Sequence, residues 1–286
     1  FLAISPVHAL YPGTGEDFSP YSPSSRLFLN GALGDPALLG LPPLENHAAG
    51  ELIDWRTAMP DRLAMLRALF NSCSPAERER ITALASADAA ALQRHALFDA
   101  LDRVFRPGGA DGWRDWPSEF RDPASPAVRR FAQEHAEDVA FHAFVQGLAR
   151  GSLDHAQAAA KSASMPLGLI ADLAVGVRPG GSDAWAIRDA MLDGLTIGAP
   201  PDPLGPHGQN WGLTTFSPRG LAERGFAPWI DLLRASLAWS GGVRIDHSYG
   251  LARLWVSPEG GNPADGTYLH YPFLDLVRLA MLEAHR

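Results

Sequence analysis

Two short apolar segments that end near a carboxylate constrain the fold most strongly. Residues 167–173 read LGLIADL and residues 242–246 read GVRID, and a helical pattern at residues 228–239 lies between them. Strands that alternate with helices of this length form βαβ units with parallel strands. In barrels of such units the chemistry lies at the C-terminal ends of the strands, where Asp172 and Asp246 stand. The sequence therefore predicts an α/β fold that contains part of a (β/α)8 barrel.

The pattern changes twice along the chain and predicts three regions. Residues 1–45 open with FLAISPV, typical of a buried strand, and continue as a long irregular loop. Residues 46–165 read as a largely helical insertion, and residues 166–286 return to βα units. Only three barrel strands are recognisable, whereas eight close a barrel. We therefore expect an incomplete barrel, and both ends of the chain look cut from a longer protein.

The first loop and the helical region carry further signals. A loop of this length is typically either functional or disordered, and its aromatic residues Tyr11, Phe18, Tyr21 and Phe28 favour an ordered binding loop. Helix starts are predicted at Ser74–Glu77, a capping box, and at Ser125–Pro126. The helical core is predicted from two apolar stripes: Leu63, Leu66, Leu69 and Phe70, and Leu97, Leu101, Val104 and Phe105.

Charge and composition exclude several classes of function. The chain has 24 basic and 32 acidic residues, so its net charge of −8 disfavours binding to nucleic acid or to an anionic membrane. No apolar run approaches the roughly 20 residues of a membrane helix, and the first residues lack the basic segment of a signal peptide. We expect a cytoplasmic protein. Cys73 is the single cysteine, which excludes a disulfide framework and a cysteine-based zinc site. The ten histidines have no metal-binding spacing.

The segment RID at residues 244–246 is the best candidate for chemistry. The strand period of two places Arg244 and Asp246 on one face, with Ile245 on the other. A guanidinium near a carboxylate favours its ionised form, which suits a nucleophile at neutral pH. The alternative for the same pair, and on the spacing alone the commoner one, is an ordinary structural ion pair. His247 adds a polar group at the end of the strand.

Two other segments offer polar groups for a ligand, each with a structural alternative. Asp172 ends its strand at the matching position, where it would bind a polyhydroxyl substrate, tune the nucleophile or simply cap a helix. The Pro- and Gly-rich loop at residues 199–212 carries Asp202, Gln209 and Trp211. An indole flanked by amide and carboxylate groups suits a sugar ring, while a packed loop whose indole covers the barrel helices is the alternative.

Five segments together resemble one family, the bacterial amylomaltases or 4-α-glucanotransferases (disproportionating enzymes) of the α-amylase superfamily. They are SPVHALYPG at 5–13, SPYSPSSRLFLN at 19–30, GLIADLAVGVRPGGSDAW at 168–185, APPDPLGPHGQNWGL at 199–213 and RIDHSYGLARLWVSP at 244–258. The closing DGTYLHYPFLDLVRLAMLEAHR is also similar to the family, and the resemblance is weakest in the helical region. It implies a TIM barrel and the transfer of α-1,4-glucan segments.

The resemblance also implies roles for individual residues. Asp246 matches the nucleophile that attacks the anomeric carbon, and Arg244 matches the residue that keeps it ionised. Asp172 and Tyr21 match residues that line the subsite of that glucose unit, with Tyr21 as an aromatic platform. The remaining candidate substrate-binding residues are Asp202, Gln209, Trp211 and His247. Residues 19–30 are implied to shape the same end of the site without individual roles.

The implied mechanism is a retaining double displacement, which needs a second carboxyl group as general acid/base. The family's glutamate for this role is expected after Arg286, outside this chain, and Glu283 is rejected because it lies in a helical pattern. No metal or organic cofactor is expected. The expected substrates are maltooligosaccharides and α-1,4-glucans, with glucose as an acceptor, and the oligomeric state stays undefined.

Two alternatives differ in their activity. A hydrolytic relative of α-amylase would share Arg244 and Asp246, but the segment GQNWGL at 208–213 favours the transferase. Alternatively, these residues alone form a non-catalytic glucan-binding fragment. An open sheet of three strands exposes edges and apolar faces, so we expect aggregation or partial order when residues 1–286 are expressed alone.

Overall fold

Three parallel strands form the sheet that carries the predicted site. In the computed structural model, which describes residues 1–11, 19–45, 54–85 and 88–286, these strands are ordered β1-β4-β7. Their bounds are Leu2–Ala3 for β1, Leu169–Leu173 for β4 and Val243–Ile245 for β7. Both pairs are parallel, and Asp172 lies opposite Arg244 in the register of β4 and β7. The three expected strands and their parallel direction are confirmed.

The prediction that the first segment is a buried strand is wrong. Phe1 is 72% exposed and Leu2 is 51% exposed. Among the described residues, β1 pairs only with β4, so it lies at the edge of the sheet. Its main chain therefore pairs on one side only among these residues, and the side chains of Phe1 and Leu2 contact solvent.

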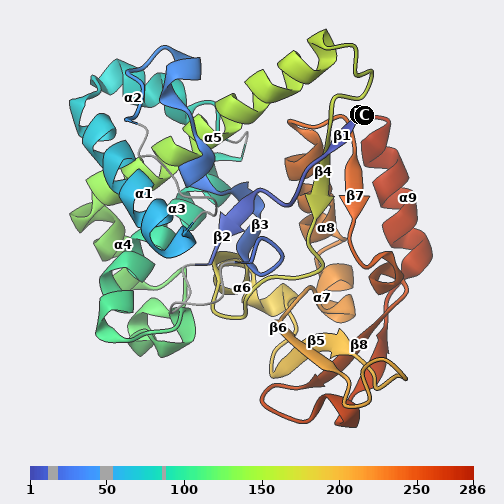
Figure 1. Cartoon of the computed structure of the whole chain (residues 1–286). Helices are drawn as coiled ribbons and strands as arrows, with labels where there is room; N and C mark the ends of the chain where they lie inside the picture. The colour runs from blue at the N-terminus through green and yellow to red at the C-terminus, as the bar shows by residue number, and fades with distance from the viewer. Residues whose placement is uncertain (12–18, 46–53, 86–87) are drawn as a thin grey trace.

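Two helices pack beside this sheet in Figure 1. They are α8, Ala227–Leu237, and α9, Phe273–Ala284, and α8 confirms the helix predicted at residues 228–239. Trp229 of α8 donates its indole N–H to the carbonyl oxygen of Leu276 in α9, at 3.1 Å. Both residues belong to a core cluster that also contains Leu173 at the end of β4. The two helices thus pack against Leu173 at the end of β4.

A hairpin lies within the segment predicted as an irregular loop in residues 1–45. Strand β2, His8–Leu10, pairs antiparallel with β3, Pro23–Leu29. Tyr11 and Phe28 are 4% and 7% exposed, so they are core residues rather than binding residues. Tyr21 stays accessible at 38%, and Phe18 lies outside the described residues. The hairpin was missed because the buried part of β3 is polar, as Ser25 and its neighbours bind Asp183.

The helical character predicted for residues 46–165 is confirmed in its described part. Its helices are α1 Trp55–Ser72, α2 Pro75–Thr82, α3 Ala89–Phe105, α4 Pro126–Glu134 and α5 Ala136–Ser162. The capping box of Ser74 and Glu77 is formed, and Ser125 caps α4. Most of the predicted stripe residues are in the core. Val104 is an exception, since it is 48% exposed on α3.

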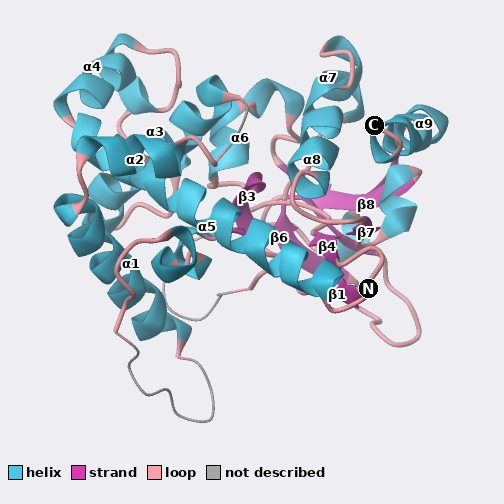
Figure 2. Cartoon of the chain, turned by 90° about the horizontal axis from the view of Figure 1, so that it is seen from above, coloured by secondary structure: helices cyan, strands magenta, loops and turns pink. Residues whose placement is uncertain are grey.

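The helices share their core with the hairpin. Phe28 of β3 belongs to the same cluster as Phe98 and Leu101 of α3. The side-chain amide of Gln146 in α5 binds both main-chain groups of Leu29, at 2.9 and 2.8 Å. Figure 2 shows the long helix α5 crossing from the helical side to the parallel strands. The hairpin is therefore held between the helices and the sheet.

A second sheet, which the sequence did not predict, lies near the C-terminal ends of the parallel strands (Figure 1). Its four antiparallel strands are ordered β6-β5-β8-β9, with bounds Gln209–Leu213, Leu195–Ala199, Arg253–Pro258 and Thr267–His270. The short helix α6, Ser182–Ala186, lies between β4 and β5 in the chain, and α7, Pro218–Glu223, lies between β6 and α8. No helix in the described ranges has the length and apolar character needed to span a bilayer.

Candidate active site

Arg244 joins two carboxylates at the ends of adjacent parallel strands. Its Nη1 atom binds Asp172 Oδ1 at 2.5 Å, and its Nη2 atom binds Asp246 Oδ1 at 3.0 Å. Asp172 is buried, whereas the side chains of Asp246 and Arg244 are partly open to solvent. The predicted contact between Arg244 and Asp246 is confirmed, and the strand register brings Asp172 into the same cluster. The hydrogen bond to Asp172 raises the pKa of Arg244, so the guanidinium stays charged.

Tyr21 reaches this cluster from the loop between β2 and β3. Its hydroxyl donates to Asp172 Oδ2 at 2.9 Å, so the two oxygens of Asp172 are bound by Tyr21 and Arg244. The hydrogen bond to the carboxylate raises the pKa of the Tyr21 hydroxyl, which keeps its proton. Tyr21 is therefore placed beside the carboxylates, as the sequence predicted, with its ring partly exposed.

The side chains of Trp211 and His247 form a second part of the site. Their rings meet edge to face, with centroids 5.2 Å apart. The indole N–H of Trp211 donates to Gln209 Oε1 at 2.9 Å, which fixes the ring against the exposed amide. His247 follows Asp246 directly and has a left-handed backbone with φ of 47°. The contact with His247 therefore places Trp211 next to the residue that directly follows Asp246, the predicted nucleophile.

The loop predicted at residues 199–212 needs a correction. Gln209 and Trp211 lie on strand β6, which pairs with β5, and only the segment before them is a loop. A side chain at Gly198 of β5 would lie 1.9 Å from the Gln209 carbonyl oxygen, so the two strands approach closely only because glycine stands there. Asp202 accepts hydrogen bonds from the main-chain N–H groups of Leu204 and Gly205, so it stabilises the exposed turn.

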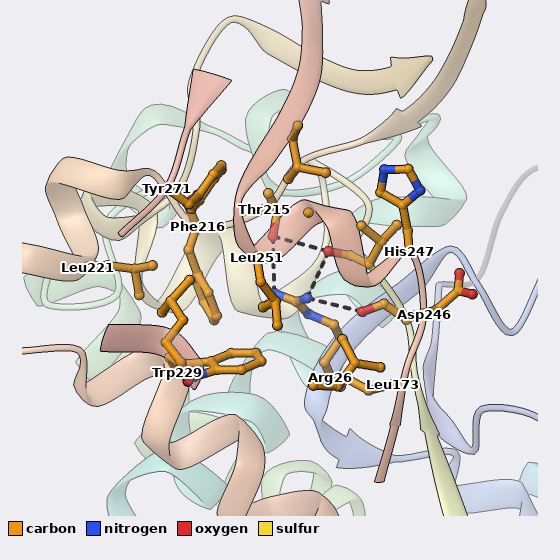
Figure 3. A pocket seen from close by; sticks show the side chains of 16 residues that line it. Arg26, Leu173, Thr215, Phe216, Leu221, Trp229, Asp246, His247, Leu251 and Tyr271 are labelled. Carbon is orange, nitrogen blue, oxygen red and sulfur yellow. Dashed lines mark hydrogen bonds between the residues drawn. The ribbon is translucent and has the colours of Figure 1, made fainter. Parts of the chain in front are cut away.

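Arg26 of β3 is a residue beneath the site that the sequence did not single out. It lines a cavity of about 50 Å³ together with Thr215, Asp246 and His247 (Figure 3). Its guanidinium donates to the carbonyl oxygens of Ala174 and Val175 and to Thr215 Oγ1. A lone charged residue within the otherwise uncharged strand segment PSSRLFL was the available signal.

Within the described ranges, no group of three or more His, Cys, Asp or Glu side chains is arranged to hold a metal ion. Glu283 lies in α9, where both carboxylate oxygens accept hydrogen bonds from Arg234 at 2.8 Å. These bonds lower the pKa of Glu283, so this residue is unsuited to donate a proton.

The whole chain, residues 1–286, matches the family model described as 4-alpha-glucanotransferase. The chain belongs to this family. It is 36% identical over 308 residues to the 4-alpha-glucanotransferase of Mycobacterium bovis, with 100% of the chain and 42% of that protein covered. For the 4-alpha-glucanotransferase of Haemophilus influenzae, the identity is 33%, with 100% and 45% covered. The chain thus spans less than half the length of these curated members of the 4-alpha-glucanotransferase family.

Two solved structures have a similar fold. The amylomaltase from Corynebacterium glutamicum superimposes with a TM-score of 0.79 at 31% identity, with 99% of the chain and 40% of that protein covered. An amylomaltase from Streptococcus agalactiae in complex with acarbose gives a TM-score of 0.84 at 18% identity, with 99% and 59% covered. The resemblance to the amylomaltases stated from the sequence is confirmed at the level of the family and the fold.

Proposed function

We propose that the protein that carries this chain is a 4-alpha-glucanotransferase. It would cleave an α-1,4-glucan, hold the glycosyl segment on Asp246 and transfer it to another glucan or to glucose. The observation that carries the proposal is the bridge of Arg244 between Asp172 and Asp246, formed at the strand ends of a chain whose full length matches this family. The acarbose complex of the Streptococcus agalactiae amylomaltase supports a glucan-binding site in this fold.

The proposed architecture is a (β/α)8 TIM barrel of which β1, β4 and β7 form one arc. Residues 1–45 would supply a barrel strand and a substrate-site loop, residues 46–165 a helical insertion, and residues 166–286 further βα units with the active-site loop. The shares of 42% and 45% by which the chain covers its relatives support the view that other strands lie outside these residues. The cytoplasmic location stays a prediction.

In the proposed mechanism, the Asp246 carboxylate attacks the anomeric carbon while the glycosidic bond breaks and the leaving oxygen takes a proton. A covalent glycosyl-enzyme forms. The hydroxyl of an acceptor glucan then attacks the same carbon, loses its proton to the general base and releases Asp246, so the anomeric configuration is retained. Arg244 supports both steps, because its guanidinium orients the Asp246 oxygen and offsets the negative charge of two adjacent carboxylates.

The general acid/base is proposed to lie outside these residues. Asp172 is unsuited to the role, because its two oxygens already accept hydrogen bonds from Tyr21 and Arg244. Glu283 is held by Arg234 in α9. Proton transfer and electrostatic stabilisation are sufficient for this reaction, so the proposal includes no metal ion or organic cofactor.

The remaining predicted residues would bind glucan. Tyr21 and Asp172 would hold the glucose unit that is bonded to Asp246, since they are the nearest polar partners of Arg244. Trp211, fixed by Gln209 and next to His247, offers an aromatic surface for an adjoining sugar ring. Asp202 would act indirectly through the turn that precedes β6.

The test is product analysis after incubation of the whole protein that carries these residues with maltotriose. A transferase gives glucose together with a ladder of longer maltodextrins, whereas a hydrolase gives glucose and maltose without longer products. We expect Asp246→Asn to lower the rate by a factor on the order of 10³ or more, because the amide is a poor nucleophile.

Asp122→Asn is the matched control, since Asp122 is an exposed carboxylate in the helical region whose side chain only caps a local turn. It should retain full activity. Full activity of Asp246→Asn would refute the assigned nucleophile. A ladder made by residues 1–286 alone would refute the view that the acid/base lies elsewhere. Hydrolysis without longer products would favour the hydrolase.

A further inference from the structure

Arg26 is a buried cation whose hydrogen-bond partners are mostly main-chain oxygens. The residue is 5% exposed, and Asp183, the carboxylate that acts most strongly on its charge, accepts a hydrogen bond from the main-chain N–H of Arg26. In the side chain, Nη1 donates to the carbonyl oxygens of Ala174 and Val175 at 3.1 and 2.9 Å, and Nη2 donates to Thr215 Oγ1 at 3.4 Å. Burial lowers the pKa of Arg26 to about 10, because the protein interior disfavours the charged form.

The segment that Arg26 binds also holds the main chain of Asp246. The carbonyl oxygen of Leu173 accepts the N–H of Asp246 at 3.1 Å. The N–H of Ala174, in the same peptide group, donates to Nε2 of His8 at 3.4 Å. The next two carbonyl groups are the ones that Arg26 binds. Residues of the β2–β3 hairpin therefore bind residues 174 and 175 through hydrogen bonds. The preceding residue, Leu173, binds the main chain of Asp246.

We propose that Arg26 is a positioning residue for Asp246. By fixing the peptide groups that follow β4, its guanidinium holds the Leu173 carbonyl group, and with it the Asp246 main chain, at a constant position relative to Arg244 and the bound sugar. This inference rests on the proposed function. Because nucleophilic attack depends on sub-ångström alignment, loss of this anchor should affect the chemical step more than substrate binding.

The geometry requires arginine rather than any cation. Two carbonyl oxygens and one hydroxyl are bound at once by a planar, forked group, whereas a lysine ammonium is a compact charge that cannot span all three. Thr215 donates its own hydroxyl to the Val175 carbonyl oxygen at 3.2 Å, so it forms a weaker second arm of the same anchor. Figure 3 shows the Arg26 guanidinium next to Thr215, in the pocket that Asp246 also lines.

The experiment measures kcat and KM for maltotriose disproportionation in the whole protein that carries these residues. The variants are Arg26→Lys, which keeps the charge, and Arg26→Met, which removes it. Arg62→Met is the matched control, because Arg62 in helix α1 also donates to two carbonyl oxygens, those of Ala32 and Gly34. Circular dichroism and the melting temperature report whether each variant is folded.

We expect kcat to fall about 10- to 100-fold in both Arg26 variants, while KM changes by less than about threefold. The control should keep its kcat. In Arg26→Ala, added guanidinium chloride should restore part of kcat, whereas an equal concentration of sodium chloride should not. A merely structural role would lower the folded fraction and would give no such recovery.

Each result has a defined meaning. If the unsubstituted protein produces no longer maltodextrins, the proposed function fails and this inference with it. If the protein is active and a folded Arg26→Met variant keeps its kcat, the inference alone is refuted. Should the Arg26 variants fail to fold, Thr215→Val tests the same anchor, and an unchanged kcat in that variant would overturn the proposal.

Discussion

The hydrogen bond between Tyr21 and Asp172 makes a quantitative prediction about the site. The donor and acceptor oxygens are 2.9 Å apart, and the acceptor belongs to a carboxylate that is 7% exposed. A hydrogen bond to a charged group contributes about 1.5–3 kcal/mol. Tyr21 is 38% exposed, so water partly replaces its hydroxyl and the low end of this range applies. We expect Tyr21→Phe to cost about 1.5 kcal/mol of transition-state stabilisation, or about tenfold in kcat/KM.

A double-mutant cycle separates this bond from the general effect of changing the ring. Asp172→Ala removes the acceptor and also frees one side of Arg244, and the latter cost cancels in the cycle. In the Asp172→Ala background, Tyr21→Phe should therefore lower kcat/KM by less than about twofold. Alanine is preferred to asparagine because an amide would offer the Tyr21 hydroxyl a new partner.

The assay is the release of glucose from maltotriose by the four proteins of the cycle, with the free energy of unfolding measured for each. A factor for Tyr21→Phe that is the same with and without Asp172 would refute the reasoning, since the two residues would then act independently. A coupling that exists in unfolding but not in kcat/KM would show that the bond serves only the fold.

Two other predictions concern stability in denaturant. Gln146→Leu should lower the free energy of unfolding by about 3 kcal/mol, because both main-chain groups of the half-buried Leu29 lose their partner; a urea midpoint equal to that of the unsubstituted protein would contradict this. Acidification below about pH 6 should destabilise the protein. Burial lowers the pKa of three histidines to about 3: His8, His95 and His142. Between about pH 6 and 4.5 these histidines take up protons only in the unfolded chain, so the folded state loses stability as the pH falls. Asp99, whose pKa burial raises to about 8, keeps its proton in the folded protein over the same pH range and so offsets part of this loss. Urea midpoints that stay constant over this range would contradict the assignment.

The sequence predicted those features that depend on neighbouring residues. The capping box at Ser74 and the apolar period of α1 and α3 are local, and the structure contains them. The alternation of side chains along β7 is also local, so the contact of Arg244 with Asp246 was predictable. The placement of Asp172 near Asp246 followed from two parallel strands that end at the same edge, whereas the register that sets Asp172 opposite Arg244 did not.

The antiparallel elements were missed because long-range pairing overrides the local signal. Strand β6 contains Gly212 with φ of 64° and follows Gly208 with φ of 70°, so its sequence reads as a loop. It is a strand because Gly198 of β5 lets the two chains approach. In β3, Ser24, Ser25 and Arg26 are buried although they are polar, which hides the apolar pattern of a strand.

The residues missed beneath the site share a physical reason. Arg26, His8 and Gln146 bind mainly main-chain groups. A peptide carbonyl or N–H is the same at every position, so no pattern of residues marks Ala174 as the partner of Arg26 and His8. The reactive carboxylates can be recognised because the chemistry selects their residue types. The groups that keep those carboxylates in place are selected by the path of the main chain, and that path is set by contacts between residues about 150 positions apart in the sequence.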